Sequence, residues 1–150
     1  MPSQTTPGAV LINLTTGHWT AQMLRVVSEL SIADLVKDGP RSSADLAAAA
    51  NANEDALYRV LRALASQGVF EESGHRVFSQ TAMSALLRAD IPGSLRAWAM
   101  MISAELTWRV WPALIHTVRT GESAVEKTFG PHVREGSPPT RSLASSSTSR

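Results

Sequence analysis

The side chains best suited to chemistry in this sequence are four histidines, and they stand far apart along the chain: His18, His75, His116 and His132. None of them shares a helix face with a second histidine or a carboxylate at the spacing that a metal site needs. The chain has no serine in a Gly-x-Ser-x-Gly turn and no glycine-rich loop that could hold a phosphate. Glu71 and Glu72 are neighbours in a segment expected to be a strand, so their carboxylates point to opposite faces. The sequence therefore predicts no catalytic, cofactor-binding or metal-binding residue in this chain.

Composition narrows the possible functions further. The chain has 150 residues, of which 43% are hydrophobic and 18% charged, so a globular domain with a buried core is expected. The formal net charge of +1 gives no strong attraction to nucleic acid or to an anionic membrane. The lack of cysteine excludes disulfide scaffolds and thiolate chemistry, and the short apolar runs predict no membrane span. We expect a cytoplasmic protein, because the N-terminus carries no basic and apolar leader.

The elements that would position these side chains begin with two apolar helices. From residue 9 to residue 36, apolar side chains recur at three- and four-residue steps, as in a helix: Val10, Leu11, Leu14, Met23, Leu24, Val27 and Leu30. Gly17 is predicted to break or bend this segment, with Trp19 beginning the second helix. Residues 1–8 are predicted to be disordered, and a short further helix is expected over residues 32–36.

The middle of the chain predicts a winged helix, which is a helix-turn-helix followed by a β-hairpin. Ser42 or Ser43 is suited to cap a first helix, and a second helix over residues 54–66 carries one continuous apolar face. Two short strands, 69–72 and 76–79, then flank a turn that contains glycine. Because these signals occur in the order that a winged helix requires, the expected fold class is mainly α with this motif at its centre.

The C-terminal part is predicted to be helical up to residue 130. Helices are expected over residues 81–87, from a cap at Ser94 to Met101, and over 105–118, where Pro112 would be tolerated as a kink or a new first turn. Residues 131–150 are dominated by Ser, Pro, Thr and Arg and are predicted to be a disordered tail. The sequence thus predicts one domain over residues 9–130 with additional helices on both sides of the winged helix.

A winged helix raises the possibility of a DNA-binding transcription regulator. The helix that would enter the major groove starts with Glu54 and Asp55, which would face phosphates of like charge. Arg59 and Arg62 could contact the backbone, and Arg76 on the wing could enter a minor groove. The low net charge argues against nucleic acid as a partner, so DNA binding stays the alternative interpretation.

The apolar N-terminal segment favours a protein partner instead. A winged helix already has a core, and apolar helices added to a small domain usually pack against another subunit. The predicted interface residues are Val10, Leu11, Leu14, Trp19 and Met23, although packing within one subunit remains open. Further along, Trp98, Trp108 and Trp111 lie near Met100 and Met101, which suits a hydrophobic interface, an apolar ligand wall or plain core.

The order of these motifs resembles the N-terminal domain of S-adenosylmethionine-dependent O-methyltransferases of the caffeate, acetylserotonin and bacterial polyketide type. The resemblance rests on residues 14–19, 32–35 and 55–70, continues through 92–98 and 118–122, and covers roughly the first 130 residues. It implies a winged-helix domain whose N-terminal helices intertwine in a homodimer and which closes over a small-molecule hydroxyl acceptor. In the intact family, S-adenosylmethionine and the catalytic histidine belong to a separate C-terminal domain, whose motifs do not occur here.

The resemblance also names candidate substrate-lining residues, His18, Trp19, Met101 and Trp108, and leaves this chain with no catalytic residue. After Gly130 the sequence departs from the family, and one hypothesis is that residues 131–150 are translated out of frame, leaving a truncated methyltransferase. A further alternative is an interaction module that pairs with a separately encoded catalytic chain.

Overall fold

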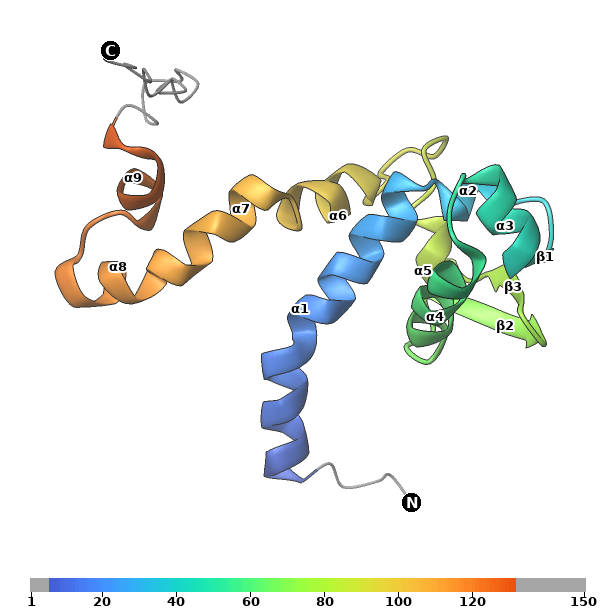
Figure 1. The fold of residues 1–150 in the computed structure, drawn as a ribbon, viewed down its shortest axis with the longest axis horizontal. Coiled ribbons are helices and arrows are strands. Elements are labelled where there is room, and N and C mark those ends of the chain that lie inside the picture. The colour runs from blue at the N-terminus through green and yellow to red at the C-terminus, as the bar shows by residue number, and fades with distance from the viewer. Residues whose placement is uncertain (1–5, 132–150) are drawn as a thin grey trace, which may run out of the picture. The chain divides into compact units, whose positions relative to one another are not determined.

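A computed structural model of the chain describes residues 6–131, which are mainly helical with one small antiparallel sheet (Figure 1). The predicted mainly-α fold class is confirmed. The chain divides into two compact units, Met1–Ala104 and Glu105–Arg150. Most of the predicted N-terminal disorder and all but the first residue of the predicted tail lie outside the described residues.

The first unit contains the predicted winged-helix elements and the helices on either side of them. Its described elements, in chain order, are α1 (Pro7–Glu29), α2 (Ile32–Leu35), β1 (Arg41–Ser42), α3 (Ser43–Ala49), α4 (Glu54–Ala65), β2 (Phe70–Gly74), β3 (Val77–Gln80), α5 (Ala82–Ala85) and α6 (Arg96–Ile102). The second unit consists of α7 (Glu105–Val110), the 3-10 turn η1 (Trp111–Ala113), α8 (Leu114–Thr120) and α9 (Ala124–Phe129).

The predicted break at Gly17 is wrong, because α1 runs without interruption from Pro7 to Glu29. Thr6 caps the helix by accepting the N–H of Ala9 at 3.3 Å, and Pro7 in the first turn has no N–H to leave unpaired. Pro7 and Gly8 are therefore helical where the sequence predicted disorder. A glycine inside a helix costs only about 1 kcal/mol relative to alanine, which the rest of the helix outweighs.

The helix pair and the hairpin form as their local signals predict. Ser42 caps α3 by accepting the N–H of Asp45 at 3.1 Å, and Asn53 caps α4 by accepting that of Ala56 at 3.0 Å. The sheet order is β1-β3-β2, entirely antiparallel, with a bulge in β2. The two short strands of the predicted hairpin are β2 and β3, so the motif order expected from the sequence is present.

The core of the first unit lies where α1, α2, α3 and α4 meet the hairpin. Its largest fully buried side chains are Phe70 and Phe78 from the hairpin, Ile32 from α2, Leu46 from α3, and Leu61 and Leu64 from α4. The predicted apolar face of α4 is this core face. The helix pair and the hairpin thus share one hydrophobic core.

The C-terminal helices are shorter than predicted. The expected helix over residues 81–87 is confined to α5, and the expected helix over 105–118 is divided into α7, η1 and α8. Pro112 lies in η1, where a new first turn begins, because its nitrogen cannot donate to the preceding turn. Ser94 was predicted to be the N-cap of the helix that ends near Met101, but the N-cap of α6 is the next residue, Leu95. Ser94 Oγ still accepts the N–H of Arg96 at 3.2 Å.

Candidate functional site

The N-terminal half of α1 presents large apolar side chains to water. Leu14 is 73% exposed, Leu11 63% and Val10 43%, and we call these three residues the α1 apolar face. They are one helical turn or less apart, so they form one stripe. No Asp, Glu, Lys or Arg occurs between residues 7 and 24. In Figure 1 this end of α1, in blue, extends past the other elements of its unit.

The C-terminal half of α1 is covered by α6. Gln22 Nε2 and Arg25 Nη1 both donate to the carbonyl of Ser103, at 3.2 and 3.0 Å, and Ser103 Oγ donates to the carbonyl of Ala21 at 2.9 Å. Ser103 is itself buried. One half of the helix is therefore fixed to its own unit while the other half is left in water.

The predicted interface residues fall into two groups. Val10, Leu11, Leu14 and Trp19 are exposed on α1, whereas Met23 is partly buried against the core. Trp19 and Met23 also line a cavity of about 670 Å³ between α1 and the C-terminal end of α4. Thr20 Oγ1 and the side-chain amide of Gln67 exchange hydrogen bonds of 3.1 to 3.2 Å at this cavity.

The four predicted substrate-lining residues come from three elements. His18 and Trp19 are neighbours on α1, with ring centroids 5.8 Å apart in an edge-to-face arrangement. His18 Nδ1 lies 2.9 Å from the carbonyl of Thr15. Met101 stands exposed on α6 of the same unit, and Trp108 belongs to α7 in the second unit. The structure brings together the first two.

The first turn of α4, which would meet DNA, is ion-paired with Arg76 of the hairpin. Arg76 Nη1 lies 2.9 Å from Glu54 Oε1 and Nη2 lies 2.8 Å from Asp55 Oδ1, while its guanidinium carbon is 4.5 Å from the ring centroid of Tyr58. The hydrogen bonds to Asp55 and then to Glu54 raise the pKa of Arg76. The side chain that was predicted to enter a minor groove is thus ion-paired with α4 in the structure.

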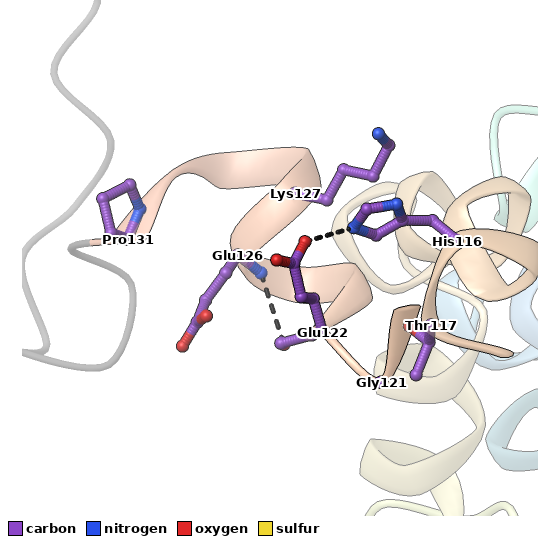
Figure 2. Close-up of a pocket in the computed structure, with 8 residues that line it drawn as sticks. His116, Thr117, Gly121, Glu122, Glu126, Lys127 and Pro131 are labelled. Atoms are coloured by element: carbon purple, nitrogen blue, oxygen red, sulfur yellow. Dashed lines mark hydrogen bonds and ion pairs between the residues drawn. The ribbon is translucent and has the colours of Figure 1, made fainter. Parts of the chain in front are cut away.

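The second unit holds a polar cavity of about 660 Å³ at the junction of α8 and α9 (Figure 2). His116 Nε2 and Glu122 Oε2 are 3.0 Å apart across it, and Ser123 Oγ caps α9 by accepting the N–H of Glu126 at 3.4 Å. Sequence reasoning missed this pair because its members are six positions apart, which is not the three- or four-residue spacing of neighbours on one helix face. Gly121, which has a φ of +77° and ends α8, was the available signal that the chain turns back there.

Other kinds of site are not formed by the part of the chain that the structure describes. Within residues 6–131, no three His, Asp or Glu side chains gather in a group that could hold a metal ion. No helix in the same range has both the length and the apolar content needed to cross a membrane.

Comparison with known proteins decides which family this geometry belongs to. Residues 12–90, more than half of the chain, match the model of the O-methyltransferase dimerisation domain. The chain belongs to this family. The dimerisation-domain match covers α1 from Ile12 through α5, and a domain of this kind implies association between copies.

Relatives of this dimerisation domain are methyltransferases of microbial biosynthesis. The phenazine O-methyltransferase PhzM of Lysobacter antibioticus is 44% identical over 122 residues, which are 81% of this chain and 36% of that protein. The crystal structure of LaPhzM matches with a TM-score of 0.78 and 43% identity over 84% of this chain and 38% of that one. A methyltransferase of calicheamicin biosynthesis in its SAH-bound form matches with a TM-score of 0.74 and 31% identity, over 91% of this chain and 41% of its own.

The chain therefore spans little more than a third of the length of these relatives. None of these matches supports the alternative of a DNA-binding regulator.

Proposed function

We propose that this chain forms a homodimer through the exposed half of α1 and acts as the dimerisation and substrate-cap domain of a small-molecule O-methyltransferase. The observation that carries the proposal is the α1 apolar face, which lies in water, whereas Gln22 and Arg25 in the other half of the helix are hydrogen-bonded to Ser103 of their own unit. Burying large apolar side chains from water is the main driving force of association. The match to the dimerisation-domain family supports a second copy as the partner.

In the intact enzyme that we envisage, a methyl group passes from S-adenosylmethionine to a hydroxyl of a small acceptor molecule. The part proposed for this chain is to hold the two subunits together and to supply walls of the acceptor pocket, with His18, Trp19, Met101 and Trp108 as the lining candidates. The SAH-bound relative supports S-adenosylmethionine as the family's methyl donor. This chain by itself is expected to bind no methyl donor, and isothermal titration calorimetry with S-adenosylmethionine checks this: micromolar affinity would contradict it.

Charge substitutions on α1 test the homodimer. In sedimentation velocity the chain should run as a dimer at micromolar concentration, and Leu11→Asp or Leu14→Asp should each make it a monomer, because a carboxylate would have to be buried without a partner. Both side chains are mostly in water within one copy, so the fold should survive, which circular dichroism checks. Met83→Asp, on an exposed apolar residue of α5, is the matched control and should leave the dimer intact. A dimer that persists in both α1 variants would refute the assigned interface.

A further inference from the structure

The cavity of about 670 Å³ between α1 and the C-terminal end of α4 lies within the first unit, and we call it the α1–α4 cavity. Its volume is in the range of small-molecule pockets in proteins, which is roughly 300–1,000 Å³. Both helices are fixed to the same core, because Val27 of α1 and Leu61 of α4 are buried in it. The cavity is therefore formed by one copy of the chain.

The α1–α4 cavity lies on a different side of α1 from the α1 apolar face. Thr16 and Thr20 line the cavity. Successive residues of an α-helix are turned by about 100°, so Thr20 points about 180° away from Leu11, and Thr16 about 160° away from Leu14. A second copy that covers the α1 apolar face therefore does not by itself fill this cavity.

The wall of the cavity combines apolar and polar side chains without a charge. Trp19 and Met23 supply apolar surface, and Trp19 is 61% exposed. Hydroxyl and amide groups are supplied by Asn13, Thr16, Thr20, Ser66 and Gln67. None of the described residues that line the cavity is charged. A charged ligand would lose water here without gaining a counter-charge, so the side chains favour an uncharged one.

The hydrogen bonds already made at the wall show what a ligand must offer. Thr16 Oγ1 and Ser66 Oγ each donate their hydrogen to a backbone carbonyl of their own helix, at 2.8 and 2.7 Å, so they are left as acceptors. The amide of Gln67 has two N–H donors and two lone pairs on its oxygen, and Thr20 Oγ1 engages one of each. The wall thus retains both acceptors and a donor.

We propose that the α1–α4 cavity binds a flat, uncharged aromatic molecule that carries a hydrogen-bond donor and an acceptor at its edge, as a cyclic amide does. The ring stacks on the indole of Trp19, which offers a large flat face. The ligand N–H donates to the hydroxyl oxygens, and the ligand carbonyl accepts from Gln67. The site goes beyond the function proposed above, because it uses neither a methyl donor nor a second copy.

Carbostyril, a flat two-ring cyclic amide, is the probe for this site. It is titrated into the isotope-labelled full-length chain, and NMR follows the indole N–H of Trp19 and the side-chain amide of Gln67. Saturating shifts of both signals are expected at submillimolar probe, the range open to a ligand of this size. No saturable shift at either signal would overturn the proposal.

Gly17 allows the cavity to be blocked sterically. It lines the cavity, and a Cβ placed on it would meet no atom within 4 Å. Gly17→Leu should therefore weaken carbostyril binding at least tenfold while the helix remains formed. Gly8→Leu is the matched control, because Gly8 is also in α1 with open space around its Cβ but does not line the cavity. Equal affinity in the two variants would overturn the proposal.

Two relatives of the probe and one further variant test the assigned chemistry. Quinoline lacks the amide and should bind roughly tenfold more weakly, since a neutral hydrogen bond contributes about 1 kcal/mol. Quinaldate carries a carboxylate and should give no saturable shift. Gln67→Leu should weaken carbostyril binding by a similar factor without adding bulk to α1. Binding of quinaldate as tight as that of carbostyril would overturn the assignment of an uncharged ligand.

Sedimentation of the same variants separates the ligand site from the homodimer. Gly17→Leu and Gly8→Leu, both folded by circular dichroism, should sediment alike. If Gly17→Leu alone became a monomer, a second copy would occupy the cavity, so the homodimer would stand and the ligand site would fall. If the unmodified chain sedimented as a monomer and still bound carbostyril, the ligand site would stand and the homodimer would fall.

Discussion

Replacing Gly17 by alanine should stabilise the helix in which it lies. Gly17 is in the middle of α1, and a Cβ placed on it would meet no atom within 4 Å. Its φ is not in the positive range, so alanine adopts the same backbone without strain. The gain is then the ordinary difference in helix propensity, about 0.5–1 kcal/mol. Since about 1.4 kcal/mol is a tenfold change, the local opening constant should fall roughly two- to fivefold.

Amide hydrogen exchange over residues 9–16, at concentrations where the chain is monomeric, measures this effect, because the exposed half of α1 opens independently of the core. Gly93→Ala is the matched control: its Cβ also meets nothing, but its φ is +75°, so alanine there should destabilise the fold by about 1 kcal/mol. The effect of Gly93→Ala is read by urea titration, and exchange over residues 9–16 should stay unchanged in that variant. Faster exchange in Gly17→Ala would refute the conclusion that α1 is a continuous helix.

Three further substitutions test the core and the loop before α6. Leu61→Ala removes a fully buried side chain and should lower the free energy of unfolding by about 2–5 kcal/mol in urea titration. Ser28→Ala should raise it by roughly 1 kcal/mol in thermal unfolding, because the buried Ser28 Oγ has no hydrogen-bond partner among the described residues. The hydrogen bonds from Arg88 lower the pKa of Asp90 to about 2 from its ordinary 3.8. The ionised Asp90 carboxylate therefore stabilises the fold above pH 3.8, and this stabilisation is lost as the pH falls through 2. In Arg88→Gln the NMR titration midpoint of Asp90 should rise towards 3.8, and an unchanged midpoint would contradict the assigned cause.

Elements with local signals could be predicted from the sequence. The caps Ser42 and Asn53 accept hydrogen bonds from N–H groups three residues further along the chain. The buried residues Leu57, Leu61 and Leu64 repeat at helical spacing. Both signals are local, so the sequence alone predicted the helix pair. The prediction of a break at Gly17 was wrong because it considered the low helix propensity of one glycine and not the stability of the 23-residue helix around it.

Contacts between distant residues could not be predicted in this way. Arg76 reaches Glu54 and Asp55 across more than twenty positions, and only the packing of the hairpin on α4 makes that pairing possible. Of the five predicted interface residues, Val10, Leu11, Leu14 and Trp19 are exposed, whereas Met23 is partly buried against the core. The sequence contained no information on which of them α6 would cover, because that depends on the path of the chain after Gly93.

The uncharged and exposed half of α1 has a consequence for the abundance of the protein in a cell. A copy that has not met another displays the kind of surface that chaperones and proteases recognise, and in the homodimer proposed above association buries that surface. The fraction of copies that escape degradation then depends on the rate at which two copies meet, which grows with the square of the protein's concentration. Doubling synthesis should therefore more than double the steady-state amount, whereas a small deficit in synthesis should deplete the protein disproportionately.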